Sequence, residues 1–150
     1  MSEKIVIARN KKARHDYFIN EVIEVGIVLT GTEVKSLRDR KASIGEAYAS
    51  AEEGDIYLIN AHIAEYPQAK YGNHHPRRKR KLLLHRKQIE KFGGNIKKKG
   101  ISLIPLNLYF NKRGIAKLEI AIVKGKKQHD KRQTIKERDW QRNKERVLKG

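Results

Sequence analysis

Histidines and carboxylates are the side chains here that could do chemistry, and their spacing argues against catalysis. No acidic pair lies at metal-ligand spacing from the scattered histidines His62, His74, His75, His85 and His129. His74 and His75 fall in a basic segment that would repel a divalent cation. Most carboxylates have lysine and arginine neighbours, as in surface ion pairs rather than acid–base catalysis. We therefore expect no enzymatic activity, no metal and no cofactor.

Positive charge is the strongest feature of the sequence. The 150 residues include 35 Lys+Arg and 17 Asp+Glu, a formal net charge of +18. Nearly all of the excess lies in two segments: residues 77–99, with eleven cations and one acid, and residues 124–150, with eleven cations and four acids. Such blocks favour nucleic-acid binding, because each block can neutralise several phosphates and release their counterions. Two contact surfaces and one continuous patch both fit this pattern.

Three absences narrow the class of protein. The sequence has no cysteine, which excludes disulfides and thiolate metal sites and fits a reducing compartment. No run of about 18 apolar residues is present, so we expect no membrane span. The first nine residues lack the apolar stretch and cleavage site of a signal peptide. We expect a cytoplasmic protein.

Apolar runs and turn residues predict mostly strands in residues 1–124. Enrichment in β-branched and aromatic residues predicts strands over 17–19, 22–29, 47–51 and 56–63. Thr30 and Glu33 have the spacing of a capping box and predict a short helix after them. A second helix is expected over 84–99, and 66–80 is expected to be an exposed loop because it has no apolar periodicity.

A hairpin is the clearest local prediction. Leu106, Leu108 and Phe110 are expected on one face of a strand, Asn111–Gly114 in the turn, and the return strand presents Leu118, Ile120 and Ile122. Many short strands in about 120 residues predict a mainly β fold with flanking helices. The leading candidate is an oligonucleotide-binding, antiparallel β-barrel.

Residues 125–150 are expected to form a separate basic tail. This segment has few large apolar residues, and its like charges repel on a helix, so we expect it to be disordered when free and helical on a partner. Trp140 has two interpretations. It docks on the barrel, or it stacks on a base once the helix forms.

Three residues outside the tail are candidates for RNA contact. His15 follows a basic run and is either a core-edge histidine or an RNA contact. Glu24 lies on a predicted strand, where it pairs with a cation or accepts a hydrogen bond from a base amino group. Lys117 lies on the polar side of the return strand, opposite the Leu118 face.

Four blocks resemble the small protein B family, the SsrA-binding proteins that partner transfer-messenger RNA. They are Asn10–Phe18, Gly31–Arg38, Arg80–Leu84 and Gly125–Arg132, in the family's order and spacing. The resemblance implies a barrel that binds the transfer-RNA-like domain of this RNA and enters the vacant A site of a stalled ribosome. Nascent-chain tagging and ribosome rescue follow, without chemistry by the protein itself.

The resemblance also assigns residues. It implies that transfer-messenger RNA contacts His15, Glu24, Leu83, His85 and Lys117. It implies that the decoding centre meets His129, Asp130, Lys131 and Arg132, and that the message channel receives Trp140, Val147 and Leu148. A message in the channel would exclude the tail. Folding of the tail would therefore test whether the message channel is vacant. The alternatives are a general RNA chaperone or ribosome-associated structural protein and, as a remote third, an RNA-processing enzyme.

Overall fold

The structure is a computed structural model that describes residues 4–96 and 100–125. The proposed boundary between barrel and tail at residue 125 therefore falls at the end of the described chain. Outside the described residues lie all of the tail residues assigned to the ribosome, namely His129, Asp130, Lys131, Arg132, Trp140, Val147 and Leu148. Their roles stay predictions.

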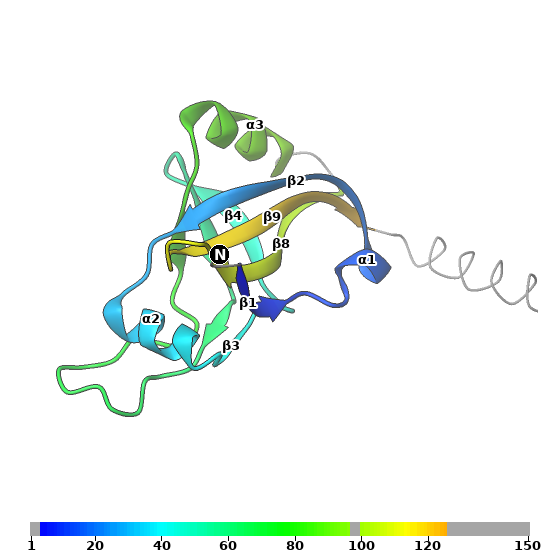
Figure 1. Cartoon of the computed structure of the whole chain (residues 1–150). Helices are drawn as coiled ribbons and strands as arrows, with labels where there is room; N and C mark the ends of the chain where they lie inside the picture. Colours follow the sequence, from blue (N-terminus) through cyan, green and yellow to red (C-terminus); the bar gives the residue numbers. More distant parts are fainter. Residues whose placement is uncertain (1–3, 97–99, 126–150) are drawn as a thin grey trace, which may run out of the picture.

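Strands are the main regular structure of the described chain, and three short helices flank them (Figure 1). The helices are α1 (Ala13–Asp16), α2 (Gly31–Arg38) and α3 (Arg86–Ile96). The strands are β1 (Ile5–Arg9), β2 (Tyr17–Ile27), β3 (Ala42–Ser43), β4 (Tyr48–Glu52), β5 (Asp55–Ile59), β6 (His62–Ile63), β7 (Arg80–Leu83), β8 (Ile101–Phe110) and β9 (Ala116–Gly125). The two predicted segments 17–19 and 22–29 form the single strand β2. The segment predicted over 56–63 is divided between β5 and β6.

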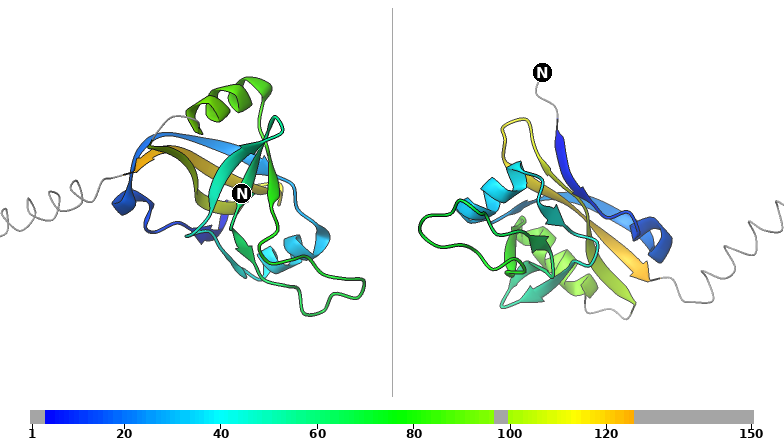
Figure 2. Two further views of the ribbon diagram at one scale, coloured as in Figure 1. Left: turned by 180° about the vertical axis from the view of Figure 1, so that it is seen from behind. Right: turned by 90° about the horizontal axis from the view of Figure 1, so that it is seen from below.

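The main sheet closes on itself, so the expected antiparallel barrel is confirmed. Its strand order is β1-β8-β4-β5-β7-β2-β9, and β9 pairs again with β8 (Figures 1 and 2). Strand β8 completes the ring by pairing at Leu103 with Ala49 of β4, while its last residues pair with β1. Closure matters because it pairs strand edges that would otherwise be open to other chains, although among the described strands β1 pairs with β8 alone and keeps one edge.

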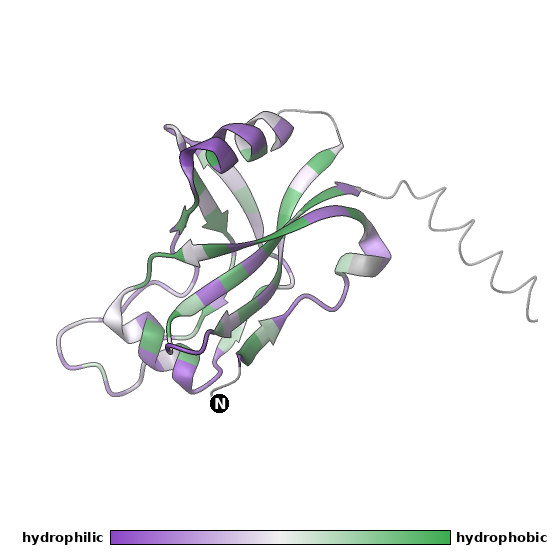
Figure 3. Ribbon diagram, turned by 45° about the horizontal axis from the view of Figure 1, so that its top comes forward, coloured by the Kyte–Doolittle hydropathy of each residue, from purple (hydrophilic) through white to green (hydrophobic). Residues whose placement is uncertain are grey.

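The core explains where the hairpin prediction was wrong. Leu108 and Phe110 belong to the main core, but Leu106 packs against a second cluster around Ile104 and Val123. A register shift between Pro105 and Asn107 causes the difference. One extra residue in a strand moves the following side chains to the opposite face. Hydrophobic and hydrophilic residues alternate along the strands in Figure 3, as a barrel with one buried face requires.

The segment over 66–80 was expected to be an exposed loop, and this is wrong at His74 and Arg80. Arg80 begins β7 with its side chain fully buried, where it donates to Glu33 and to the carbonyls of Ala61 and Pro76, both at 3.0 Å. Glu33 belongs to the predicted capping box and accepts from Thr30 N–H at 2.8 Å. A buried charge needs such partners, and an apolar pattern cannot reveal them.

Acid should weaken this buried pair. Burial alone would raise the pKa of Glu33, but donors from Arg78, Thr30 and Arg80 outweigh it and hold the pKa below its ordinary value. A lowered pKa stabilises the fold above the unfolded value of about 4.3, and this contribution is lost as pH falls through the lower folded value. Glu33→Gln also leaves Arg80 uncompensated, a loss of about 3–5 kcal/mol at neutral pH.

Urea unfolding followed by circular dichroism, at neutral pH and at acidic pH, tests this prediction. Glu33→Gln should reduce the difference in the free energy of unfolding between neutral and acidic pH. Glu52→Gln is the matched control, because Glu52 pairs with Lys79 in an exposed position and should change stability little. Equal losses from the two variants would contradict the role given to burial.

Candidate nucleic-acid interface

One row of residues crosses four strands on the outside of the barrel. Gly26 of β2 pairs with Leu83 of β7 on one side and with Lys117 of β9 on the other. Lys117 pairs in turn with Tyr109 of β8. Glu24, two residues before Gly26, shares its face because side chains alternate along a strand. Backbone register alone thus brings distant parts of the chain together.

A cleft of about 460 Å³ lies over this row. Four of the five barrel residues expected to bind RNA line it, together with neighbours from β2, α3 and the link between β7 and α3: Glu24, Gly26, Leu83, Leu84, His85, Gln88 and Lys117. The cleft therefore combines a carboxylate, a cation, an imidazole and an apolar side chain, held mostly on strands. Groups of these kinds suit an RNA strand, which offers phosphates, base edges and base faces.

Leu83 reaches the cleft because Gly26 has no side chain. A Cβ added at Gly26 would lie 3.1 Å from the Cβ of Leu83, tighter than normal packing. Leu83 is 53% exposed although it belongs to a barrel strand. An apolar side chain in this position can pack on a base or a ribose.

Glu24 is oriented by a residue that sequence reasoning missed. The hydroxyl of Tyr109 donates a hydrogen bond to the Glu24 carboxylate. Burial, together with this bond, raises the pKa of Tyr109, so its hydroxyl keeps its proton. Lys4 covers the ring, with Nζ 4.1 Å from the centroid, and pairs with Glu119 at 2.5 Å. Tyr109 lies between Leu108 and Phe110, and the alternation of that strand gives no reason to single it out as a functional residue.

Lys117 is placed to meet an anion. Within residues 4–96 and 100–125 its ammonium has neither a hydrogen-bond nor an ion-pair partner, although Glu24 lines the same cleft. A cation without an internal partner is available to a phosphate. Lys117 therefore contributes positive charge where the carboxylate of Glu24 is already engaged by Tyr109.

His85 lies at the beginning of α3, where the backbone is held by Gln88. The His85 N–H donates to the Gln88 side-chain oxygen at 3.1 Å, half of a capping box. The first turn of α3 contains Arg86 and Lys87 and no acid. Cations are unfavourable at this positive end of a helix dipole, so the arrangement strengthens positive potential beside the cleft at some expense of helix stability.

His15 is the predicted RNA contact that the structure does not bring into the cleft. It lies on α1, nine residues before Glu24, and its Nδ1 is 2.9 Å from an oxygen of Asp16. The neighbouring Tyr17 pairs with Gly125, the last described residue. His15 is therefore near the last described residue of β9.

Charge block 77–99 is less available to RNA than its composition indicated. Arg80 is fully buried and Arg78 pairs with Glu33 at 2.5 Å. Lys79 pairs with Glu52 at 2.5 Å and Lys81 with Asp55 at 3.5 Å. Arg80 does not contribute to the several phosphate contacts expected of this block, because a guanidinium with no exposed surface cannot reach a phosphate.

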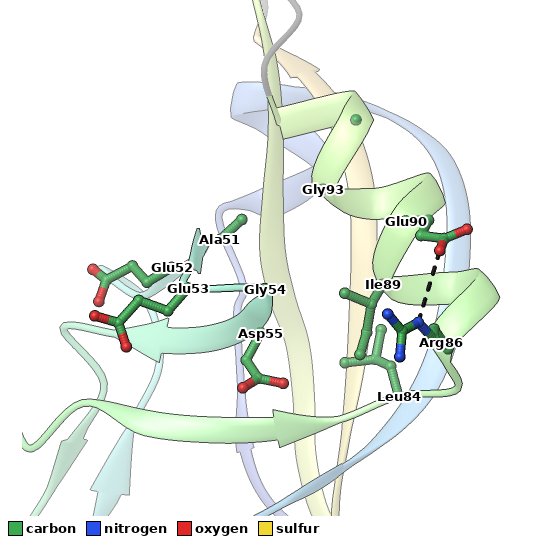
Figure 4. Close-up of a pocket in the computed structure, with 11 residues that line it drawn as sticks. Ala51, Glu52, Glu53, Gly54, Asp55, Leu84, Arg86, Ile89, Glu90 and Gly93 are labelled. Atoms are coloured by element: carbon green, nitrogen blue, oxygen red, sulfur yellow. Dashed lines mark ion pairs between the residues drawn. The ribbon is translucent and has the colours of Figure 1, made fainter.

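A larger cleft, of about 880 Å³, lies between α3 and the β4–β5 hairpin (Figure 4). Its walls carry four carboxylates, on Glu52, Glu53, Asp55 and Glu90. Figure 4 shows the side chains of Glu52 and Glu53 pointing away from α3, and Glu90 on α3 paired to Arg86 at 3.9 Å. Carboxylates repel phosphates, so the larger volume of this cleft does not make it the RNA site. The smaller cleft, which contains Lys117, suits RNA better.

Two further searches concern the described residues only. No group of three histidine, aspartate or glutamate side chains lies close enough together there to hold a metal ion. Within the same residues, no helix has the length and apolar character needed to cross a membrane.

Comparison with known proteins decides the family. The sequence model described as SmpB protein matches residues 7–150. The chain belongs to the SmpB family. Similar SmpB relatives include the SsrA-binding protein of Rhodopseudomonas palustris, 60% identical over 145 residues, covering 97% of this chain and 92% of the relative. That of Caulobacter vibrioides is 58% identical over 144 residues, covering 96% of this chain and 95% of the relative.

A solved structure agrees with the SmpB assignment. It is described as "tmRNA-SmpB: a journey to the center of the bacterial ribosome", and one of its chains matches with a TM-score of 0.68 and 45% identity. The match covers 85% of this chain and 92% of that chain. The sequence-based resemblance to this family is thereby confirmed. The roles of individual residues are a separate matter.

Proposed function

We infer that this chain binds the transfer-RNA-like domain of transfer-messenger RNA, the SsrA RNA, and delivers it to the vacant A site of stalled ribosomes. Trans-translation, tagging of the nascent chain and release of the ribosome follow. The relatives are named SsrA-binding proteins, and the similar structure joins tmRNA and SmpB with the bacterial ribosome. The protein acts as a binding factor in the cytoplasm and is not an enzyme.

The observation that carries this proposal is the cleft over β2, β7 and β9. Backbone register places Glu24, Leu83 and Lys117 there, and the start of α3 adds His85. Lys117 binds a phosphate, Leu83 packs on a base or ribose, and His85 stacks or donates a hydrogen bond. Glu24 accepts from a base amino group, which gives preference among bases.

His15 and the tail belong to the same proposal but to another contact. His15 is next to the strand end from which residues 126–150 continue. We assign His129, Asp130, Lys131 and Arg132 to the decoding centre, and Trp140, Val147 and Leu148 to the empty message channel. Ribosomal RNA supplies the counter-charge that a basic segment needs to fold.

A general RNA-binding chaperone is the second candidate. The closed barrel and the net charge of +18 fit it equally well. Recovery of the tagged full-length protein from bacterial lysate, followed by sequencing of the bound RNA, separates the two. The rescue-factor proposal expects strong enrichment of SsrA RNA; recovery of RNA in proportion to its abundance would favour the chaperone.

Tyr109→Phe should weaken binding of the transfer-RNA-like domain through Glu24 without unfolding the barrel. The ring stays buried, and only the hydroxyl that orients the carboxylate is removed. We expect affinity to fall roughly tenfold, the effect of about one hydrogen bond to a charged group. Gel shifts measure it, and the loss should vanish in a Glu24→Ala background, because Tyr109 acts through Glu24. An undiminished loss in that background would mean that Tyr109 is merely structural.

A further inference from the structure

The loop between β6 and β7 carries an aromatic ring that the fold does not use. Tyr71 is 99% exposed at this loop. The loop projects from the end of the barrel opposite α3, beside α2 (Figures 1 and 2). One exposed ring means little by itself. Its surroundings determine whether it is a contact surface.

The loop is held in place by two polar side chains. The Asn73 amide accepts from Tyr66 N–H at 3.0 Å and donates to the Tyr66 carbonyl at 2.8 Å, which closes the loop on itself. His74 is buried, with Nε2 2.9 Å from the Ile63 carbonyl and Nδ1 2.9 Å from the Thr32 hydroxyl.

The bonds of His74 also define its tautomer. A carbonyl only accepts, so Nε2 carries the proton, and in the neutral ring the Thr32 hydroxyl donates to Nδ1. The imidazole of His74 thus joins the loop to both β6 and α2. The loop that carries Tyr71 is therefore held in place, and a pre-ordered loop loses little conformational entropy when it binds a partner.

The cleft beside Tyr71 is positively charged. It measures about 640 Å³ between the loop and the first turn of α2, and among the described residues its lining contains no acid. Lys35 and Lys70 line it together with His75. Lys70 has no hydrogen-bond or ion-pair partner in the described part of the chain, and Lys35 Nζ lies 5.4 Å from the centroid of the Tyr66 ring. Both ammonium groups are available to an anion.

We propose that this cleft is a second RNA contact, separate from the Glu24 cleft, that takes an unpaired nucleotide. Tyr71 stacks on the base, and Lys35 and Lys70 bind the flanking phosphates. Aromatic rings stack on any base that is free of its own neighbours, and lysines follow the backbone. A duplex hides its base faces and leaves the ring unused. An acidic protein would satisfy the lysines, but it would use the ring only if it also presented an aromatic or cationic side chain there.

Fluorescence titration of the full chain with a short single-stranded RNA containing 2-aminopurine tests this inference. Tyr71→Ala should weaken binding roughly fivefold or more and reduce the quenching of the probe, because one stacked base is lost. Tyr71→Phe should keep both properties. Lys70→Ala should lower the salt dependence of binding by about one unit of slope.

The matched control is Tyr48→Ala, which removes a 46% exposed tyrosine from β4 and should change nothing. Tyr71→Ala should also leave affinity for the transfer-RNA-like domain unchanged, so this inference and the proposed function fail separately. Wild-type binding of the single strand by Tyr71→Ala would overturn the inference. Equal displacement of the probe by duplex RNA or polyglutamate would do so as well, since it would reduce the cleft to a site for any polyanion.

Discussion

Ending the chain after Lys127 is expected to abolish peptide tagging on stalled ribosomes while leaving binding of the transfer-RNA-like domain nearly intact. The cleft of Glu24, Leu83, His85 and Lys117 lies wholly within the described residues. The removed segment carries most of the second charge block. The cleft and the C-terminal segment are proposed to bind different RNAs. Truncation should therefore abolish tagging without abolishing binding of the transfer-RNA-like domain.

Tagging in a reconstituted translation system with a truncated message measures the first effect, and gel shifts measure the second. A full-length chain with Trp140→Ala is the companion variant, because it keeps the charge of the tail. It should reduce tagging if Trp140 packs in the ribosome. Tagging that survives the truncation would contradict the hypothesis that folding of the tail tests whether the message channel is vacant. An even loss of affinity for all RNAs would instead favour the general chaperone.

The second large effect is expected from Glu24→Ala combined with Lys117→Ala. Affinity for the transfer-RNA-like domain should fall roughly a hundredfold, because a hydrogen bond to a charged group contributes about 1.5–3 kcal/mol and two contacts are removed. Affinity for bulk RNA should fall much less, since only one of many cations is lost. The Lys117 change alone should lower the salt slope by about 0.7–0.9.

Lys124→Ala is the matched control for this pair. Lys124 is exposed on the same strand, β9, and does not line the cleft. Its substitution should therefore lower the affinity for all RNAs slightly and to the same extent. Thermal unfolding of the double variant checks that the freed Tyr109 hydroxyl has not disturbed the barrel. Equal losses for the transfer-RNA-like domain and for bulk RNA would make Glu24 and Lys117 merely electrostatic.

Periodicity predicted much of the barrel because it reports burial directly. Leu118, Ile120 and Ile122 alternate as a half-buried strand must, and all three are core residues. It was wrong at Leu106, because a bulge changes the face of a strand without changing the pattern of residue types. It also missed β1, β3 and β7, three strands of two to five residues that carry little alternation.

Charge counting had a different limit. Lysine and arginine look alike in a sequence whether they face water or a buried carboxylate. Arg80 lies in the densest basic run, yet its partner Glu33 is 47 residues earlier. Tyr109 and Glu24 are 85 residues apart. Such pairs depend on which strands become neighbours, and local sequence does not contain that information. The resemblance to a family indicated which residues contact RNA. The register of β2 with β7 and β9 explains why these residues lie together.

Photo-crosslinking from Leu83 tests the central claim most directly. Leu83 is 53% exposed within the cleft and Tyr48 is 46% exposed on β4, so a photoreactive amino acid at either position is accessible. In the full-length protein mixed with transfer-messenger RNA, the reagent at position 83 should crosslink to the transfer-RNA-like domain, and the reagent at position 48 should not. Crosslinking from position 48 as efficient as that from position 83, or none from position 83, would contradict the account.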